Sequence, residues 1–176
     1  MIAGLLKCAV ELGNWSEALI YSQQQVARHP STAQHWHQFA DILSRLERWT
    51  EAVAAYRQAL DLDAAFSWSH HNLGAALLQL ENWPQAITAF RSAIALNPDF
   101  AWSHYNLAEA LTYLGEWNDA IAAYQTVLKC QPDLPYAAAR LADALRQRVA
   151  ADRMDSFALY QRCLLYTSPS PRDVEE

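Results

Sequence analysis

The amino-acid sequence predicts an all-α solenoid of antiparallel helix hairpins with a 34-residue period. Only four glycines and seven prolines occur in 176 residues, beside abundant alanine, leucine, glutamine and glutamate, and this composition favours helix. Self-similarity at a fixed period is typical of stacked repeat architectures, so it decides the fold class. The period is set by four tryptophans and the alanines three residues after them: Trp15 and Ala18, Trp49 and Ala52, Trp83 and Ala86, Trp117 and Ala120.

Each unit shows the apolar spacing of two helices separated by a short polar break. In the third unit, Leu73 and Leu77 mark the first helix, and Ile87 and Phe90 mark the second. A proline closes three of the units, because its ring and missing N–H stop a helix. Helices are predicted at residues 3–12, 16–28, 33–46, 50–62, 67–80, 84–96, 101–114, 118–130, 135–148 and 153–163.

The array is predicted to occupy residues 1–162. Its units lie at about 1–32 (partial), 33–66, 67–100, 101–134 and 135–162 (degenerate and truncated). The first unit begins partway through its first helix. The last unit lacks the tryptophan and carries Val149-Ala150-Ala151-Asp152 where its turn is expected.

The order of residue types in a unit resembles the tetratricopeptide repeat (TPR). The third unit reads His70-x-x-Leu73-Gly74 and then Ala86, Phe90, Ala93 and Pro98; the fourth follows the same order from His104-x-x-Leu107-Ala108 to Pro132. The resemblance extends over roughly residues 1–163. It implies a right-handed superhelix whose first helices line a concave groove, and a role in binding proteins or peptides.

The last residues are expected to be foreign to the fold. The run from Cys163 to Asp173 resembles the translated adapter of a transposase-based sequencing library, which suggests a fragment from environmental sequence. Residues 163–176 are therefore predicted to be an artefactual, disordered tail, and the true start at Met1 is equally open.

The composition argues against some classes of partner and favours one cellular compartment. The formal charge of -6, without a basic stripe, argues against nucleic acid and against anionic membrane. No apolar run approaches the ~20 residues of a membrane helix, and no signal peptide is evident. Three distant cysteines fit a reducing compartment, so a cytoplasmic, bacterial protein is the expectation.

The predicted site is the groove face of the first helices, where polar and aromatic side chains recur once per repeat. The column Gln38, Asn72 and Asn106 resembles the asparagine ladder of O-linked N-acetylglucosamine transferase, whose amides grip a peptide backbone. A cation clamp for a terminal carboxylate is disfavoured, because the arginines are scattered. The predicted peptide-binding residues are Gln38, Trp68, His71, Asn72, Gln79, Trp102, Tyr105, Asn106, Glu109 and Tyr113.

Other conspicuous residues are interpreted as structural. The four spaced tryptophans are expected to be largely buried, and Cys8 and Cys130 to be small core residues. His70 and His104 take the packing place that Trp36 holds, so no metal site is predicted, and no catalytic grouping or cofactor loop is found.

The function predicted from these features is a protein-binding or peptide-binding scaffold. The alternative is the TPR portion of a larger, truncated enzyme, such as a bacterial glycosyltransferase resembling O-linked N-acetylglucosamine transferase, or a sulfotransferase. End-to-end self-association through an uncapped end is a further possibility.

Overall fold

The computed structural model describes residues 2–134 and 136–167, with side chains described as far as residue 157. Within these residues the chain forms nine α-helices and no strand, which confirms the predicted all-α solenoid. The first eight helices begin and end within one residue of the predicted bounds. The helices are α1 (Ile2–Glu11), α2 (Trp15–Arg28), α3 (Ala33–Arg45), α4 (Trp49–Leu62), α5 (Ser67–Gln79), α6 (Trp83–Leu96), α7 (Ala101–Tyr113), α8 (Trp117–Cys130) and α9 (Ala137–Thr167).

The turn inside each hairpin has one geometry that recurs from repeat to repeat. In the second hairpin, the N–H of Arg48 donates to the carbonyl of Leu43, and the N–H of Glu47 donates to Ser44, which is the Schellman ending of a helix. The residue at the centre of this motif must adopt a positive φ. Its φ is positive in all four hairpins, at Gly13 (69°), Glu47 (58°), Glu81 (56°) and Gly115 (75°).

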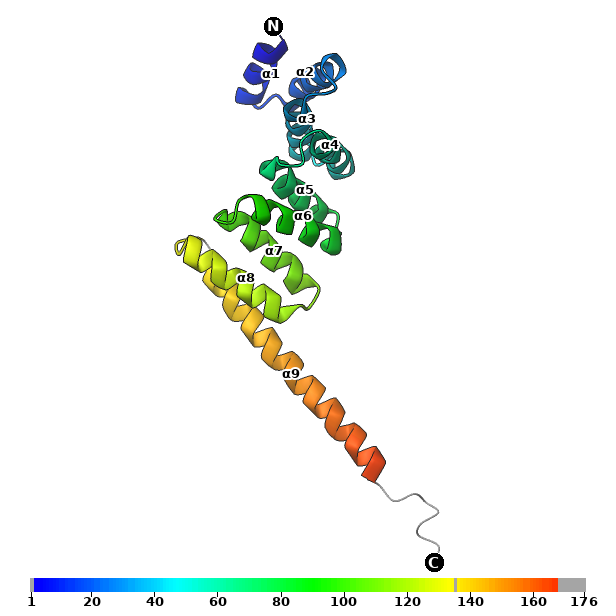
Figure 1. Ribbon diagram of the computed structural model, residues 1–176, viewed down its shortest axis with the longest axis vertical. Helices are drawn as coiled ribbons and strands as arrows, with labels where there is room; N and C mark the ends of the chain where they lie inside the picture. Colours follow the sequence, from blue (N-terminus) through cyan, green and yellow to red (C-terminus); the bar gives the residue numbers. More distant parts are fainter. Residues whose placement is uncertain (1, 135, 168–176) are drawn as a thin grey trace, which may run out of the picture.

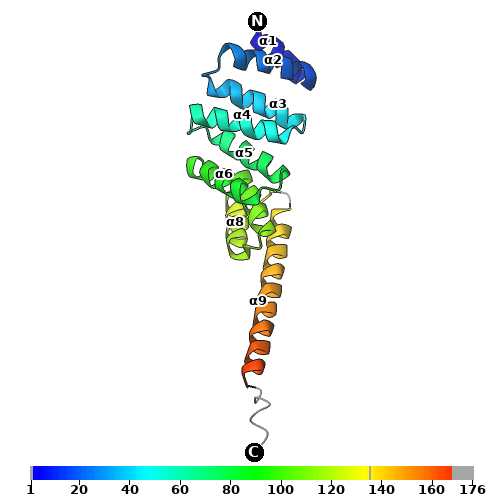
Figure 2. The same cartoon turned by 90° about the vertical axis from the view of Figure 1, so that its right-hand side faces the viewer.

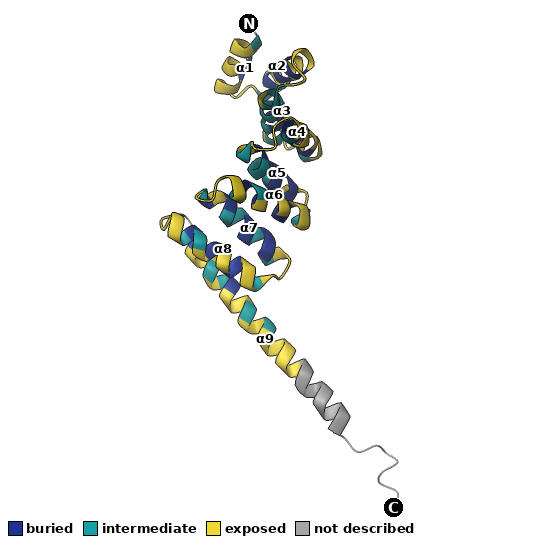
Figure 3. Cartoon of the chain, in the orientation of Figure 1, coloured by how far each residue is buried: buried dark blue, intermediate teal, exposed yellow. Residues whose placement is uncertain are grey.

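The hairpins stack one after another along the long axis of the molecule (Figures 1 and 2). Every helix from α1 to α8 packs against the next along the chain, so each hairpin shares its core with its neighbour. Small residues allow the close approach: Ala40, Gly74 and Ala108 stand at the same position of successive first helices and are all buried. In Figure 3, buried residues (dark blue) recur along the stacked helices from α2 to α8.

The predicted fifth hairpin does not form, because α9 is one continuous helix from Ala137 to Thr167. Val149 occupies the position that is Gly13, Glu47, Glu81 or Gly115 in the other units, and a β-branched residue strongly disfavours positive φ. The helix therefore runs on through the alanines that follow. Although α9 is long, neither it nor any other helix in the described residues is apolar enough to cross a membrane.

The predicted tail is helical in part. Residues 163–167 continue α9, which departs from the disorder expected there, whereas residues 168–176 lie outside the described residues. In the residues whose side chains are described, the second half of α9 is largely exposed, as Figure 3 shows, and presents Met154 and Phe157 to solvent.

The four spaced tryptophans are mostly covered, as predicted, although none of them is fully buried. Each begins a second helix, and the rings of Trp15 and Trp83 lie against side chains of the next repeat. Trp83 stacks on Tyr113 with ring centroids 4.2 Å apart, and the guanidinium of Arg45 lies over Trp15. The core expectation fails for Cys8 and Cys130, which are exposed.

Candidate functional site

The ten predicted binding residues lie on α3, α5 and α7, the first helices of the three central hairpins. These helices contact one another directly from repeat to repeat, α3 with α5 and α5 with α7. We call the side of α3, α5 and α7 that carries the ten residues the first-helix face. Trp68, Gln79, Trp102 and Tyr113 are exposed there, and Gln38, His71, Asn72, Tyr105, Asn106 and Glu109 are half-buried.

Exposed aromatic rings recur on this face at intervals of one repeat. Trp68 and Trp102 occupy the same position in successive repeats, and their exposed fractions are 51% and 45%. Tyr136 falls at the same point of the period and is exposed, but it precedes α9 and has a positive φ of 65°. The tryptophan rings are held edge-on by neighbouring rings: Trp68 by Phe100 at 4.8 Å and Trp102 by Tyr105 at 5.9 Å. Each tryptophan ring is thus positioned by packing and still open to a partner.

Asp41 is the centre of a polar cluster that joins two repeats. Its carboxylate accepts hydrogen bonds from the hydroxyl of Tyr56 (2.5 Å) and from Nδ2 of Asn72 (2.9 Å), and lies 3.3 Å from Nε2 of His37. Burial, with the Asp41 charge second, raises the pKa of Tyr56, so the phenol stays a donor. One donor atom of the predicted amide column is therefore engaged inside the protein at Asn72.

The same cluster recurs two repeats later with different residues. Glu109 takes the place of Asp41, and Arg140 takes the place of Asn72, with 3.5 Å between the charged groups. The hydrogen bond with Tyr105 and the charge of Glu109 both raise the pKa of Arg140. In the intervening repeat the acid is replaced by Ala75, which leaves Asn106 without the acidic partner that Asn72 has.

The seams between successive repeats form hollows on the first-helix face. The seam between α3 and α5 holds a pocket of 300 Å³, bounded by Trp49 and by the predicted residues Asn72 and Gln79. At the next seam, the stacked rings of Trp83 and Tyr113 occupy the equivalent positions. The seam between α1 and α3 holds a larger pocket of 570 Å³, to which the predicted residue Gln38 contributes.

His71 is a predicted binding residue whose partners are mainly internal. Its ring lies 5.0 Å from that of Phe100 and 5.7 Å from that of Phe90, and its Nδ1 is hydrogen-bonded to the hydroxyl of Ser103 at 2.9 Å. His37 and Ser69 make the same bond one repeat earlier. Burial lowers the pKa of His71 to about 4. The imidazole is therefore neutral and acts as a packing group.

We expect the folded chain to lose about 1–2 kcal/mol of stability between pH 7 and pH 5 through His71. The pKa of His71 is about 4 in the fold against an ordinary value of 6.5, so the unfolded chain takes up the proton first. The contribution is complete above pH 6.5 and is lost as the pH falls toward 4. Urea unfolding at both pH values measures it. In the variant His71→Tyr, which takes the residue found at the equivalent position 105, the free energy of unfolding should change less between pH 7 and pH 5. An equal change would show that His71 is not the source of the pH dependence.

The other histidines on the first helices have a structural role that sequence equivalence predicted. The indole of Trp36 donates to the carbonyl of Pro30, and Nε2 of His70 and of His104 are hydrogen-bonded to carbonyls six residues before them. This confirms that the two histidines replace the tryptophan. Among the described residues, no three His, Cys, Asp or Glu side chains gather into a metal-binding group.

Stacked two-helix units with a 34-residue period, shared cores and a hollowed first-helix face define a helical-repeat protein. Two family models describe such repeats and match this chain: one described as tetratricopeptide repeat over residues 71–135 and 105–163, and one described as TPR repeat over residues 40–81. The chain belongs to the tetratricopeptide repeat family.

Solved structures share the fold at low sequence identity. MamA has a TM-score of 0.81 and 18% identity, with 96% of this chain and 95% of that chain covered. MamA from Desulfovibrio magneticus RS-1 has a TM-score of 0.79 and 19% identity, with 92% and 94% covered. The first TPR of Spaghetti, bound to the HSP90 peptide SRMEEVD, has a TM-score of 0.65 and 19% identity, with 67% and 94% covered. No curated protein matches the chain.

Proposed function

We propose that this protein is an interaction scaffold that binds an extended segment of a protein partner along the first-helix face. The carrying observation is the pair of exposed aromatic rings at Trp68 and Trp102, which lie one repeat apart on this face. Rings of this kind supply large apolar contact area at little cost in entropy, because packing already fixes them. Membership of the tetratricopeptide repeat family supports the same role.

The peptide backbone is held by side-chain amides between the rings. Asn106 is the principal candidate, because the preceding repeat has Ala75 at the position of Asp41, the acid that engages Asn72. An amide both donates and accepts, so it satisfies a peptide unit of any sequence. Gln38, on the opposite side of Asn72, extends this amide column by one repeat.

The segment is bound through its interior rather than its terminal carboxylate. Arg140 is paired with Glu109, and Arg45 lies over Trp15, so the arginines on this side of the array do not converge on one point. Recognition of a carboxylate needs several charge-assisted bonds at one place. Affinity should therefore depend weakly on salt.

Asn106→Ala is expected to weaken peptide binding by about 1–2 kcal/mol, since it removes hydrogen bonds to a backbone that stays desolvated. The measurement begins with selection of ligands from an unbiased peptide library against the full chain. The best peptide is then titrated by isothermal calorimetry into the wild type and the variant.

Two control variants separate binding from folding. Asn72→Ala should reduce stability, because it removes a hydrogen bond to Asp41, and should reduce affinity less than Asn106→Ala. Gln58→Ala, on the exposed side of α4, should change neither. Unchanged affinity in Asn106→Ala would remove the amide from the proposal, and lost affinity in Gln58→Ala would move the binding surface to the second helices. The comparisons lend no support to an enzyme-linked role.

A further inference from the structure

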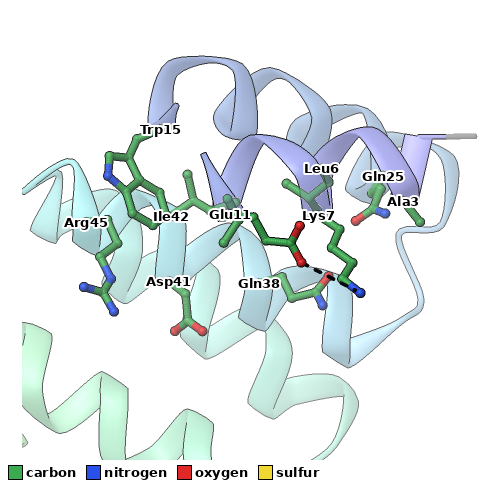
Figure 4. Close-up of a pocket in the computed structure, with 11 residues that line it drawn as sticks. Ala3, Leu6, Lys7, Glu11, Trp15, Gln25, Gln38, Asp41, Ile42 and Arg45 are labelled. Atoms are coloured by element: carbon green, nitrogen blue, oxygen red, sulfur yellow. Dashed lines mark ion pairs between the residues drawn. The ribbon is translucent and has the colours of Figure 1, made fainter. Parts of the chain in front are cut away.

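A hollow of 570 Å³ lies at the first seam, between α1, α2 and α3 (Figure 4). Its volume is nearly twice the 300 Å³ of the next seam. Leu6, Val10 and Ile42 give it an apolar wall. Trp15 and Arg45 lie at one end in Figure 4, and Ala3 and Gln25 lie at the other.

The repeat register explains why this pocket is larger. At the α3–α5 seam, the rings of His37 and Tyr56 lie 5.7 Å apart and fill the space beneath the face. The equivalent residues of the preceding repeat are Ala3 and Ser22, so two ring side chains are replaced by two small ones. Leu6, which stands where the next repeat has Ala40, restores only part of that volume.

The floor of the pocket carries a buried acceptor that the protein does not use. Gln25 is only 7% exposed, and its Oε1 has no hydrogen-bond partner among the described residues. The equivalent residues in the next three repeats are the buried, apolar Ala59, Ala93 and Val127. A buried unsatisfied carbonyl destabilises a fold, so its presence in an apolar register position points to a ligand that supplies the donor.

The charged groups around the pocket are already engaged within the protein. Lys7 lies 3.8 Å from Glu11, Arg45 lies over the ring of Trp15, and Asp41 accepts from Tyr56 and Asn72. The lining therefore has no net charge to offer. An occupant that complements it has an apolar body and a single O–H or N–H donor.

We propose that the first seam is a specificity pocket for a donor-bearing aromatic side chain, tyrosine or tryptophan, of the protein partner. The partner ring takes the space that His37 and Tyr56 fill one repeat later. The amide of Gln25, whose Oε1 is covered in the free protein, turns toward the ring and accepts a hydrogen bond from its O–H or N–H. This inference rests on the proposed scaffold function and adds the chemistry of one anchor residue. Indole and phenol fit the same pocket because both combine a flat apolar ring with a polar tip.

The test uses amino-acid amides as probes of the full chain. N-acetyl-L-tyrosinamide, N-acetyl-L-tryptophanamide and N-acetyl-L-phenylalaninamide are titrated against the ¹⁵N-labelled protein and followed by NMR. We expect shifts centred on Leu6, Gln25 and Ile42, and the tyrosine and tryptophan probes should bind about 3- to 10-fold more tightly than the phenylalanine probe. Equal or tighter binding of the phenylalanine probe would overturn the role of Gln25.

Gln25→Met separates binding from folding, because it keeps the side-chain volume and removes the acceptor. It should abolish the preference for the donor-bearing probes while raising the melting temperature by about 2–4 °C. Ala3→Tyr, which places a ring in the seam, should weaken the binding of all three probes. A preference that survives Gln25→Met refutes the pocket chemistry.

Two further outcomes keep this inference separate from the groove function. If selected peptides bind through Asn106 but the probes do not shift Gln25, the pocket inference fails and the scaffold function stands. If the pocket resonances shift with protein concentration alone, the pocket is a contact between copies of this chain, and the inference is wrong.

Discussion

Phe90→Ala is expected to lower the free energy of unfolding by about 3–5 kcal/mol, the largest effect of a single substitution that we foresee in this chain. The ring is fully buried in a cluster shared by the second, third and fourth hairpins. Its neighbours include Gly74 and the imidazole of His71. Because every repeat depends on its neighbours for burial, the cavity weakens both seams. Urea unfolding followed by circular dichroism measures the loss; a change below about 1 kcal/mol would contradict it.

A double-mutant cycle tests whether the Phe90 ring needs a glycine at position 74 to pack closely. A methyl group added at Gly74 would lie 2.6 Å from Cε1 of Phe90, so Gly74→Ala should destabilise by about 1 kcal/mol despite the better helix propensity of alanine. With Phe90→Ala already present, the clash disappears and Gly74→Ala should become stabilising. A stabilising Gly74→Ala in the wild-type background would show that the ring moves aside readily.

The positions of the helices could be predicted closely because one register governs all hairpins. Trp15, Trp49, Trp83 and Trp117 set the phase, and the polar breaks before them coincide with the Schellman turns. The same register contained the signal for the exception. Val149 falls at the position that needs positive φ, so the continuity of α9 was readable from the sequence and was missed.

The four tryptophans were predicted to be largely buried, and they are mostly but not completely covered, because periodicity gives the register of a residue and not its exact depth. The covering residue differs from seam to seam: it is Arg45 over Trp15 and Tyr113 over Trp83. How far each tryptophan ring is buried therefore depends on side chains of the following repeat, and the spacing of apolar residues does not reveal these contacts.

The predicted binding site stays a prediction, and the hydrogen bonds and ion pairs within it were not predicted. Trp68 and Trp102 are exposed, as a binding role requires, and their contacts with partners remain a prediction. The bond from Asn72 to Asp41 joins neighbouring repeats, as does the ion pair of Arg140 and Glu109. The pocket at the first seam was missed because it arises from small residues, Ala3 and Ser22, where the next repeat carries rings.

The double substitution Trp68→Ala and Trp102→Ala is expected to reduce the affinity for a selected peptide at least about 100-fold. If the two rings each contributed about 2 kcal/mol independently, the affinity would fall by more than this. Contributions of neighbouring anchors are seldom additive, so the expected loss is set lower. Both side chains are about half exposed in the free protein, so the cost in stability should be much smaller, about 1 kcal/mol each.

Calorimetric titration of the same peptide into wild type and double variant measures the effect, with circular dichroism to confirm that the helices remain. The matched control is Arg57→Ala with Arg91→Ala, two exposed residues of the second helices that are also one repeat apart. Since these arginines lie on α4 and α6, away from the first-helix face, their loss should leave affinity within about 2-fold. If the arginine pair abolishes binding and the tryptophan pair does not, the second helices carry the partner and the aromatic series serves packing alone.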